Sequence, residues 1–152
     1  MIKEISGGLV IYSLDWKNKK IKYLLLKYRG LTGKIYWGLV KGHQEKGEKI
    51  IQTVKREAKE ETGLEIKNID TKFKKEENYF FKRGNELVAK KVIYFLAKAP
   101  SLKIKLSEEH LDYKWLNLEE AKKLLKFKNL KKILEEAEKY LQRKSLKSGK
   151  KN

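Results

Sequence analysis

Three glutamates are spaced so that a helix would bring them to one side. Glu57, Glu60 and Glu61 stand at positions i, i+3 and i+4, which on a helix fall within an arc of roughly 100°. Like charges on adjacent turns repel one another, and this costs stability unless cations lie among them. Hard divalent ions such as Mg²⁺ bind this kind of oxygen cluster. The spacing therefore predicts a carboxylate site for a divalent cation, and a solvated Glu/Lys helix face is the alternative interpretation of any single triplet.

Residues around these glutamates could orient them and approach an anion. Arg56 stands four positions before Glu60 and could orient it through an ion pair. Gly42 and Gly47 fall in a glycine-rich loop that leads to Glu48, and backbone N–H groups in such a loop can come close to a phosphate. This segment therefore combines an acidic cluster with a loop suited to phosphate.

A helix is predicted to carry the acidic cluster. From Glu48 the apolar residues recur at helical spacing, and Gly63 stands where a helix C-cap prefers glycine. The length corresponds to about four turns. Further along, Asn117 and Glu120 resemble a capping box that opens a second helix, and an amphipathic stripe over residues 130–141 predicts the last one.

Strand-like runs lie before and after the acidic segment. They are rich in β-branched and aromatic residues, and polar or glycine-containing turns separate them. The predicted strands cover residues 8–12, 21–26, a short stretch around Trp37, 64–73, a stretch near 79–81, 88–97 and 113–116.

Length and composition indicate one domain. The chain has 152 residues and no Cys, a length that can bury a real core, and the lack of Cys excludes disulfides, thiolate ligands and nucleophilic cysteine chemistry. No apolar run approaches the ~20 residues of a membrane span, so we expect a soluble, cytoplasmic protein with no membrane partner. We assign residues 1–142 to the domain and residues 143–152, which have no apolar face to bury, to a basic, disordered tail.

The excess of positive charge favours an anionic ligand. Lysines are scattered through every segment, a distribution that suits a thermophile surface as well as a nucleic-acid binder. A formal net charge of +18 attracts anions and raises their encounter rate at low salt. The composition thus predicts a polyanionic ligand without specifying its kind.

The acidic segment also matches a known motif. Gly42, five residues, Glu48, seven residues and then the run REAKEETGL at 56–64 match the Nudix box at each fixed position. On these residues the chain resembles the Nudix hydrolases, which hydrolyse a nucleoside diphosphate linked to a further group. The resemblance implies a fold of the α/β class, an α/β/α sandwich with a mixed β-sheet.

The same resemblance implies roles for the acidic residues. Glu57 and Glu61 would ligate catalytic Mg²⁺, with Mn²⁺ able to substitute, and Glu60 would help in metal binding and catalysis. Arg56 and Glu48 would position them. A bound metal lowers the pKa of water, neutralises phosphate oxygens and aligns the attack, which is chemistry that these residue types can support.

Outside the box the chain resembles the asymmetrical diadenosine tetraphosphate hydrolases of the animal and archaeal type. This resemblance implies that Lys41, His43 and Lys90 contact the phosphate chain and that Tyr79 stacks on an adenine. A hydrogen-bonded loop cap for His43 and a core position for Tyr79 are the alternatives. The matching stretches are residues 37–43, 77–79 with 90–95, and 106–110 with 113–116.

A further carboxylate and the overall reaction follow from this resemblance. Glu109 would add a metal ligand or a catalytic carboxylate, with Glu108 as the other candidate. The implied activity is Mg²⁺-dependent, asymmetric hydrolysis of a dinucleoside polyphosphate, diadenosine tetraphosphate, to ATP and AMP by a monomer. One alternative is another Nudix pyrophosphohydrolase acting on modified nucleotides or RNA 5′ ends. The other is a basic RNA-binding protein with a decayed site, but the intact box does not favour a nucleic-acid partner.

Overall fold

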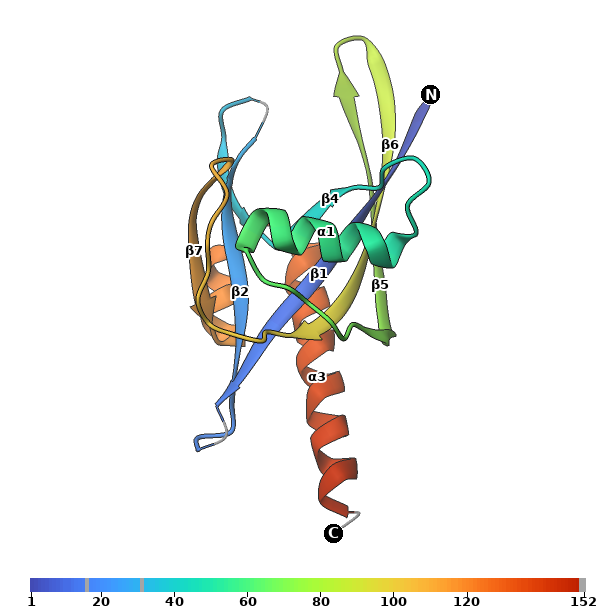
Figure 1. The fold of residues 1–152 in the computed structure, drawn as a ribbon. Helices are drawn as coiled ribbons and strands as arrows, with labels where there is room; N and C mark the ends of the chain where they lie inside the picture. Colours follow the sequence, from blue (N-terminus) through green and yellow to red (C-terminus); the bar gives the residue numbers. More distant parts are fainter. Residues whose placement is uncertain (16, 31, 151–152) are drawn as a thin grey trace.

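A seven-stranded sheet with helices on both sides forms the described part of the chain, residues 1–15, 17–30 and 32–150, in this computed structural model (Figure 1). The elements in chain order are β1 (Ile2–Asp15), β2 (Lys20–Arg29), β3 (Ile35–Gly38), β4 (Val40–His43), α1 (Ile50–Thr62), β5 (Asp70–Arg83), β6 (Glu86–Lys98), β7 (His110–Leu116), α2 (Leu118–Leu124) and α3 (Lys128–Lys150).

The sheet is mixed because one of its central pairs is parallel. Its strand order is β3-β2-β1-β6-β5, with β4 paired to β1 and β7 paired to β2. β1 and β6 run parallel over residues 2–12 and 88–98, whereas the other pairs are antiparallel. β1 pairs with β2 over residues 12–15 and with β4 over residues 6–9. The strands β1 and β2 therefore diverge, as Figure 1 shows, and β4 enters the sheet at this split.

Helices cover both faces of the sheet, which confirms the predicted α/β/α sandwich. On one face α1 packs through Val54 and Ala58, which are fully buried. On the other face α2 and α3 pack through Ala121, Leu134 and Ala137. Figure 1 shows α1 in front of the sheet and α3 behind it. The core thus consists of two apolar layers, one on each side of the sheet.

Two predicted strands differ from those observed. The sequence predicted separate strands at 64–73 and near 79–81, whereas β5 is one continuous strand. The residues between Gly63 and the start of β5 lie outside strands. Leu64 and Ile66 are buried in the core layer on the α1 side. Their alternation therefore reflects packing against that core rather than pairing in the sheet.

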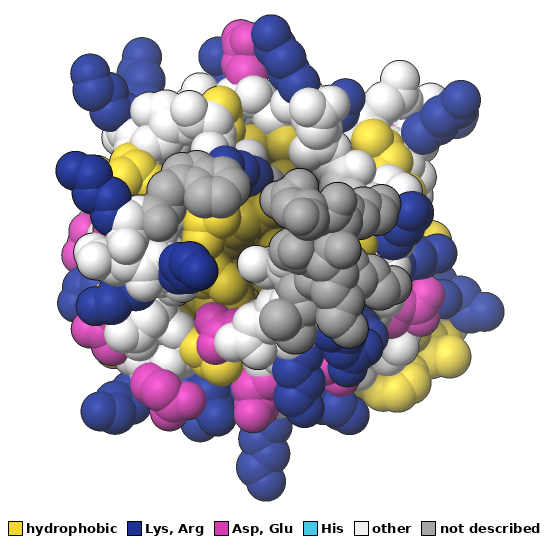
Figure 2. Space-filling model, turned by 90° about the horizontal axis from the view of Figure 1, so that it is seen from below, with side chains coloured by type: hydrophobic (Ala, Val, Ile, Leu, Met, Phe, Trp, Pro, Cys, Tyr) yellow, Lys and Arg dark blue, Asp and Glu magenta, His cyan; other side chains and the backbone are white. Residues whose placement is uncertain are grey.

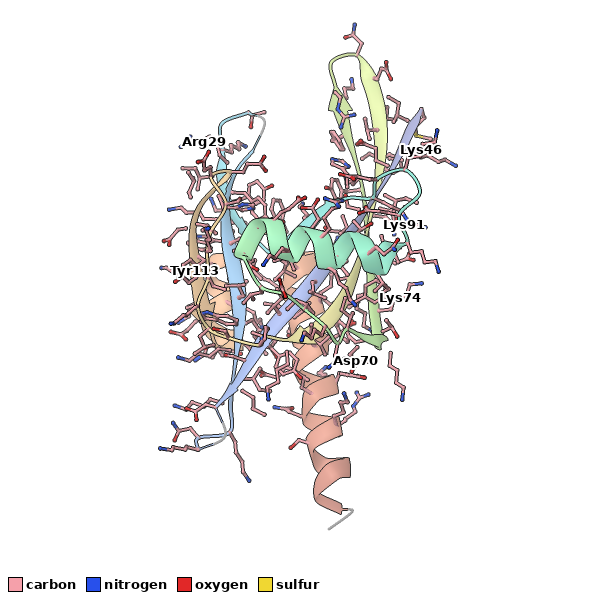
Figure 3. All side chains as sticks on the ribbon, in the orientation of Figure 1. Arg29, Lys46, Asp70, Lys74, Lys91 and Tyr113 are labelled. Carbon is pink, nitrogen blue, oxygen red and sulfur yellow. The ribbon has the colours of Figure 1, made fainter. Side chains whose placement is uncertain are left out.

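The last helix is longer than predicted. We predicted a disordered tail from Arg143, whereas α3 continues through Lys150; the last two residues of the predicted tail lie outside the described residues. Tyr140 Oη and Lys144 Nζ donate to Asp70 Oδ2 over 2.7 and 2.9 Å. Figure 3 places Asp70 at the end of β5 nearest α3. These polar contacts add to the apolar packing of Leu141 and of the Tyr140 ring against Phe73 in holding the helix to the sheet.

Basic side chains are spread over the surface. Figure 2 shows Lys and Arg around the rim of one face of the molecule, with Asp and Glu among them, rather than in one patch. None of the helices in the described ranges combines the length and the hydropathy that a membrane crossing requires. The location of a binding site must therefore come from specific contacts rather than from the overall charge.

Candidate active site

The helix α1 presents the acidic cluster as predicted. It ends at Gly63, whose φ of 76° and N–H bond to the Lys59 carbonyl confirm the predicted C-cap. Glu57 and Glu61 project from one side of the helix towards β4, since each has a contact there. Glu60 lies nearer to solvent, with 56% of its side chain exposed. The three acids therefore share one side of the helix but differ in burial.

The Glu57 carboxylate lies against the backbone of β4 at Gly42. A Cβ atom on Gly42 would lie 1.9 Å from Glu57 Cδ, so a side chain there would displace this carboxylate. Glu57 also accepts a hydrogen bond from Arg56 Nη1 over 2.8 Å. Burial raises the pKa of Glu57, the Arg56 bond opposes this rise, and the charges of Glu60 and Glu109 add to it. The carboxylate is thus held between helix and strand in an acidic environment.

Glu61 is a buried carboxylate at the centre of the site. Its Oε1 accepts a hydrogen bond from the backbone N–H of Lys41 over 3.2 Å. Its Oε2 lies 3.5 Å from both Tyr28 Oη and His110 Nε2. Burial raises the pKa of Glu61 to about 9, and the charge of Glu57 adds to the rise. A cation beside Glu57 and Glu61 would favour the charged form of both carboxyl groups.

Arg56 joins the loop before α1 to the acidic cluster. Its Nε and Nη2 donate to the two carboxylate oxygens of Glu48 over 2.6 and 3.0 Å, and Nη2 also donates to the His43 carbonyl over 2.9 Å. The predicted bond to Glu60 is present at 3.3 Å, but Glu48 is the closer partner. The Arg56 bond, together with bonds from the loop backbone and from Thr53, lowers the pKa of Glu48 to about 2. Arg56 therefore fixes the end of β4 against the helix.

The predicted phosphate-contacting residues come together beside β4. Lys90 Nζ lies 3.0 Å from His43 Nδ1, and Lys90 is 7% exposed. Glu4 lies 4.0 Å from His43 and accepts a hydrogen bond from Arg83 over 2.9 Å. Burial lowers the pKa of Lys90 to about 8, and the charge of Glu4 opposes this shift. Sequence reasoning missed Glu4 and Arg83, because no motif links the N-terminus to the β5–β6 turn.

A pocket of about 520 Å³ adjoins these residues on the α3 side of the sheet. Tyr79 forms part of its wall, and Lys41 Nζ lies 5.9 Å from the centre of the Tyr79 ring. Phe127 contacts Tyr36 edge-on, with ring centres 5.7 Å apart. The sequence alone did not identify Tyr36 or Phe127 as pocket residues. For Phe127 the available signal was its sequence context, an apolar ring between two lysines in a loop between helices. The lining residues are Tyr36, Gly38, Leu39, Lys41, Glu77, Tyr79, Tyr94 and residues 126–130.

The turn before β7 brings Glu109 towards the acidic cluster. Glu109 is exposed, and its charge raises the pKa of Glu57, whereas Glu108 lines a groove at the end of α1. The backbone N–H of Ser107 bonds to a carbonyl in the last turn of α1 over 3.1 Å, and Ser107 Oγ lies 2.8 Å from His110 Nδ1. These contacts hold the turn on the helix, so Glu109 is the better placed of the two acids.

The acidic pair suits a hard divalent cation. Glu57 and Glu61 lie one helical turn apart, and burial raises the pKa of both carboxyl groups. Proteins bind Mg²⁺ through one or two carboxylates together with substrate phosphates, and this pair lies beside residues suited to phosphate. Within the described residues, no three His, Asp or Glu side chains converge on one point. The donor chemistry of the pair therefore fits a cation that shares its coordination with a bound phosphate.

Comparison with known proteins identifies the family. The model of the NUDIX domain matches residues 10–137 of this chain. The chain belongs to the NUDIX family. Among NUDIX relatives, the asymmetrical bis(5′-nucleosyl)-tetraphosphatase of Mus musculus is 38% identical over 142 residues, which cover 88% of this chain and 92% of that protein. The protein of the same name from Caenorhabditis elegans is 32% identical over 130 residues, covering 85% and 90%. These relatives confirm the resemblance found in the sequence.

Solved NUDIX structures share the fold. A binary complex of C. elegans Ap4A hydrolase aligns with a TM-score of 0.67 and 26% identity, covering 91% of this chain and 97% of that one. The NUDIX domain of Shewanella oneidensis NrtR, complexed with ADP ribose, aligns with a TM-score of 0.72 and 20% identity, covering 92% and 90%. The second likeness concerns the fold alone. Together they confirm the predicted NUDIX fold and α/β class.

Proposed function

We propose that this NUDIX protein hydrolyses diadenosine tetraphosphate asymmetrically, giving ATP and AMP, in a reaction that needs Mg²⁺ or Mn²⁺. The position of Lys41 carries the proposal. Its ammonium group lies over the ring of Tyr79 at the pocket, and its backbone N–H bonds to Glu61 in the acidic pair. A nucleoside in the pocket would therefore have its phosphates beside the carboxylates. The names of the relatives at 32 and 38% identity agree with this proposal.

The substrate would bind through one base and its phosphate chain. An adenine stacks on Tyr79 in the pocket, where an aromatic ring offers its face to the base. The phosphates lie along Lys41, His43 and Lys90, whose charges and hydrogen bonds neutralise and orient phosphate oxygens. These contacts bring the phosphate chain of the substrate past Gly42, where the Glu57 carboxylate lies.

The acidic residues would act at the bond that is cleaved. Glu57 and Glu61 would hold the divalent cation, while Glu60 and Glu109 are the adjacent acids that would add a ligand or accept a proton from the attacking water. When bound, the cation supplies a water of lowered pKa and neutralises phosphate charge. Arg56 is a positioning residue, because its bonds fix Glu57 and the end of β4.

The reaction products test this proposal. Because the pocket holds one base and the acidic pair lies next to it, cleavage is expected away from the centre of the phosphate chain. Diadenosine tetraphosphate should yield ATP and AMP in equal amounts, measured by chromatography with and without Mg²⁺. Two molecules of ADP would contradict asymmetric cleavage. Faster hydrolysis of ADP-ribose or capped RNA, at matched low concentration and fixed salt, would contradict the choice of substrate.

Lys90 gives a pH-dependent prediction. Burial lowers its pKa to about 8, so the side chain is charged below that pH and neutral above it. The KM for the dinucleotide should therefore rise as the pH passes through about 8. Lys90→Arg should move this rise to higher pH, because a guanidinium stays protonated. Lys91→Arg, on the neighbouring strand position that faces the other side of the sheet, is the matched control and should leave the profile unchanged. An unaltered profile in Lys90→Arg would assign the rise to another group, such as Lys41.

A further inference from the structure

The hairpin of β5 and β6 has aromatic and basic side chains that extend beyond the pocket. Figure 1 shows this hairpin projecting beyond α1. In its register Tyr79 pairs with Lys90, and Phe81 pairs with Val88. Because alternate residues of a strand share a face, Phe81 lies on the same face as Tyr79 and Lys90. The side of the hairpin that continues from the pocket is therefore aromatic and cationic.

The guanidinium of Arg83 lies over the ring of Phe81 on this face. Arg83 Cζ lies 5.5 Å from the centre of the Phe81 ring, and the ring centres of Phe81 and Tyr79 are 6.2 Å apart. The Phe81 side chain is half-buried, and 50% of the Arg83 side chain is exposed. Both groups can thus be reached from solvent. An aromatic ring with an adjacent guanidinium is a surface on which nucleobases stack, with the charge available to phosphate.

Glu4 holds Arg83 in place and joins it to the phosphate-contacting residues. Its carboxylate accepts hydrogen bonds from Arg83 Nη2 over 2.9 and 3.2 Å and lies 4.0 Å from His43 Nδ1. The charge of Glu4 also acts on Lys90. Glu4 therefore links Arg83 to His43, and the two cationic groups Lys90 and Arg83 lie along the way from the end of β4 to Phe81. A polyphosphate that follows this path would leave its far end beside Phe81.

We infer that Phe81 and Arg83 form a subsite for the second nucleoside of a dinucleoside polyphosphate. This rests on the proposed function, which places the first base on Tyr79. Phe81 lies two residues from Tyr79, about 7 Å along the strand, so a dinucleotide that reaches both rings bends its phosphate chain between them. The bend lies beside His43 and Lys90, next to the acidic pair. The subsite favours ligands with two bases over ligands with one.

The test compares a ligand with two bases and a ligand with one. Phe81→Ala should raise the KM for diadenosine tetraphosphate by roughly 10- to 100-fold, the effect of losing one stacked base. The inhibition constant of ATP, which has a single base for the Tyr79 pocket, should change by less than about twofold. Phe80→Ala is the matched control, because Phe80 precedes Phe81 on the same strand, points to the opposite face and is 66% exposed. Arg83→Gln leaves the aromatic residues of the strand in place. Like Phe81→Ala, it should raise the KM for diadenosine tetraphosphate more than the inhibition constant of ATP.

The outcomes separate this inference from the proposal on which it rests. If the unmodified protein does not hydrolyse the dinucleotide, the proposed function and the second subsite both fail. If it does, and Phe81→Ala behaves like Phe80→Ala, only the second subsite fails. If Phe81→Ala raises the KM of the dinucleotide and the inhibition constant of ATP equally, the second subsite is also overturned, because Phe81 would then act on the first base or on the fold. A selective loss for the dinucleotide, with an unchanged unfolding temperature, supports it.

Discussion

Glu57→Gln is expected to lower the turnover of diadenosine tetraphosphate by about 10³-fold, the order of loss when a group that stabilises transition-state charge is removed. The substitution keeps the size of the side chain, so the contact with Gly42 and the helix packing are retained. It removes the charge that binds a hard cation. The measurement is kcat at saturating Mg²⁺, together with the shift in unfolding temperature on adding Mg²⁺, since a ligand that binds the native state stabilises it. We expect a positive shift for the unmodified protein and a much smaller one for the variant.

A surface carboxylate of the same type provides the control. Glu65, just after α1, forms an exposed ion pair with Lys59 and has 70% of its side chain exposed. Glu65→Gln should leave the turnover and the Mg²⁺-dependent shift in unfolding temperature within about twofold of those of the unmodified protein, because an exposed ion pair contributes little. If Glu57→Gln kept activity within tenfold while Mg²⁺ remained necessary, the acidic pair would not be where the cation acts.

The acidic cluster was predictable because its chemistry depends on spacing along one helix. Carboxylates that share a cation from one helix must stand three or four residues apart, and Gly63 marks where that helix ends. The structure confirms the predicted helix and its C-cap. The position of Glu57 beside Gly42 was not predicted, because it depends on how β4 packs on the helix. A local pattern was sufficient here because one element supplies most of the cluster.

Residues that reach the site from distant segments were not predictable in the same way. Glu4, Arg83 and Phe127 lie outside any motif and join the site through tertiary structure. Glu4 comes near Lys90 because β1 pairs in parallel with β6 over its whole first part, and parallel partners are distant in sequence. Phe127 reaches the pocket because α3 begins at that edge of the sheet. The strand predicted from Leu64 was wrong for a related reason. The alternation of apolar residues at Leu64 and Ile66 arises from packing in a core layer, and a strand produces the same pattern.

Gly42→Ala is expected to reduce turnover by about 100-fold or more, because a displacement of about 1 Å in a reacting group has an effect of that order. The new Cβ would lie 1.9 Å from Glu57 Cδ, 2.1 Å from Oε1 and 2.3 Å from Oε2. Gly42 does not have a positive φ in the structure, so its backbone accepts alanine without strain. The atoms that clash are the end of a flexible side chain, which can rotate away while the strand stays in place. Activity should therefore fall while the unfolding temperature changes little.

The control for this change is a glycine with ordinary space around it. A Cβ on Gly30 would meet its nearest atoms, the Lys34 carbonyl oxygen and Tyr36 Cε1, at 3.4 Å, so Gly30→Ala should leave turnover within about twofold. Comparing the two alanines separates displacement of Glu57 from a general effect of removing a glycine. Full activity in Gly42→Ala would mean that the reaction tolerates a displaced Glu57 carboxylate, and the contact with β4 would then have no part in catalysis. A large loss confined to Gly42→Ala, together with a loss of the Mg²⁺-dependent rise in unfolding temperature, would show that β4 sets the position at which the acidic pair holds its cation.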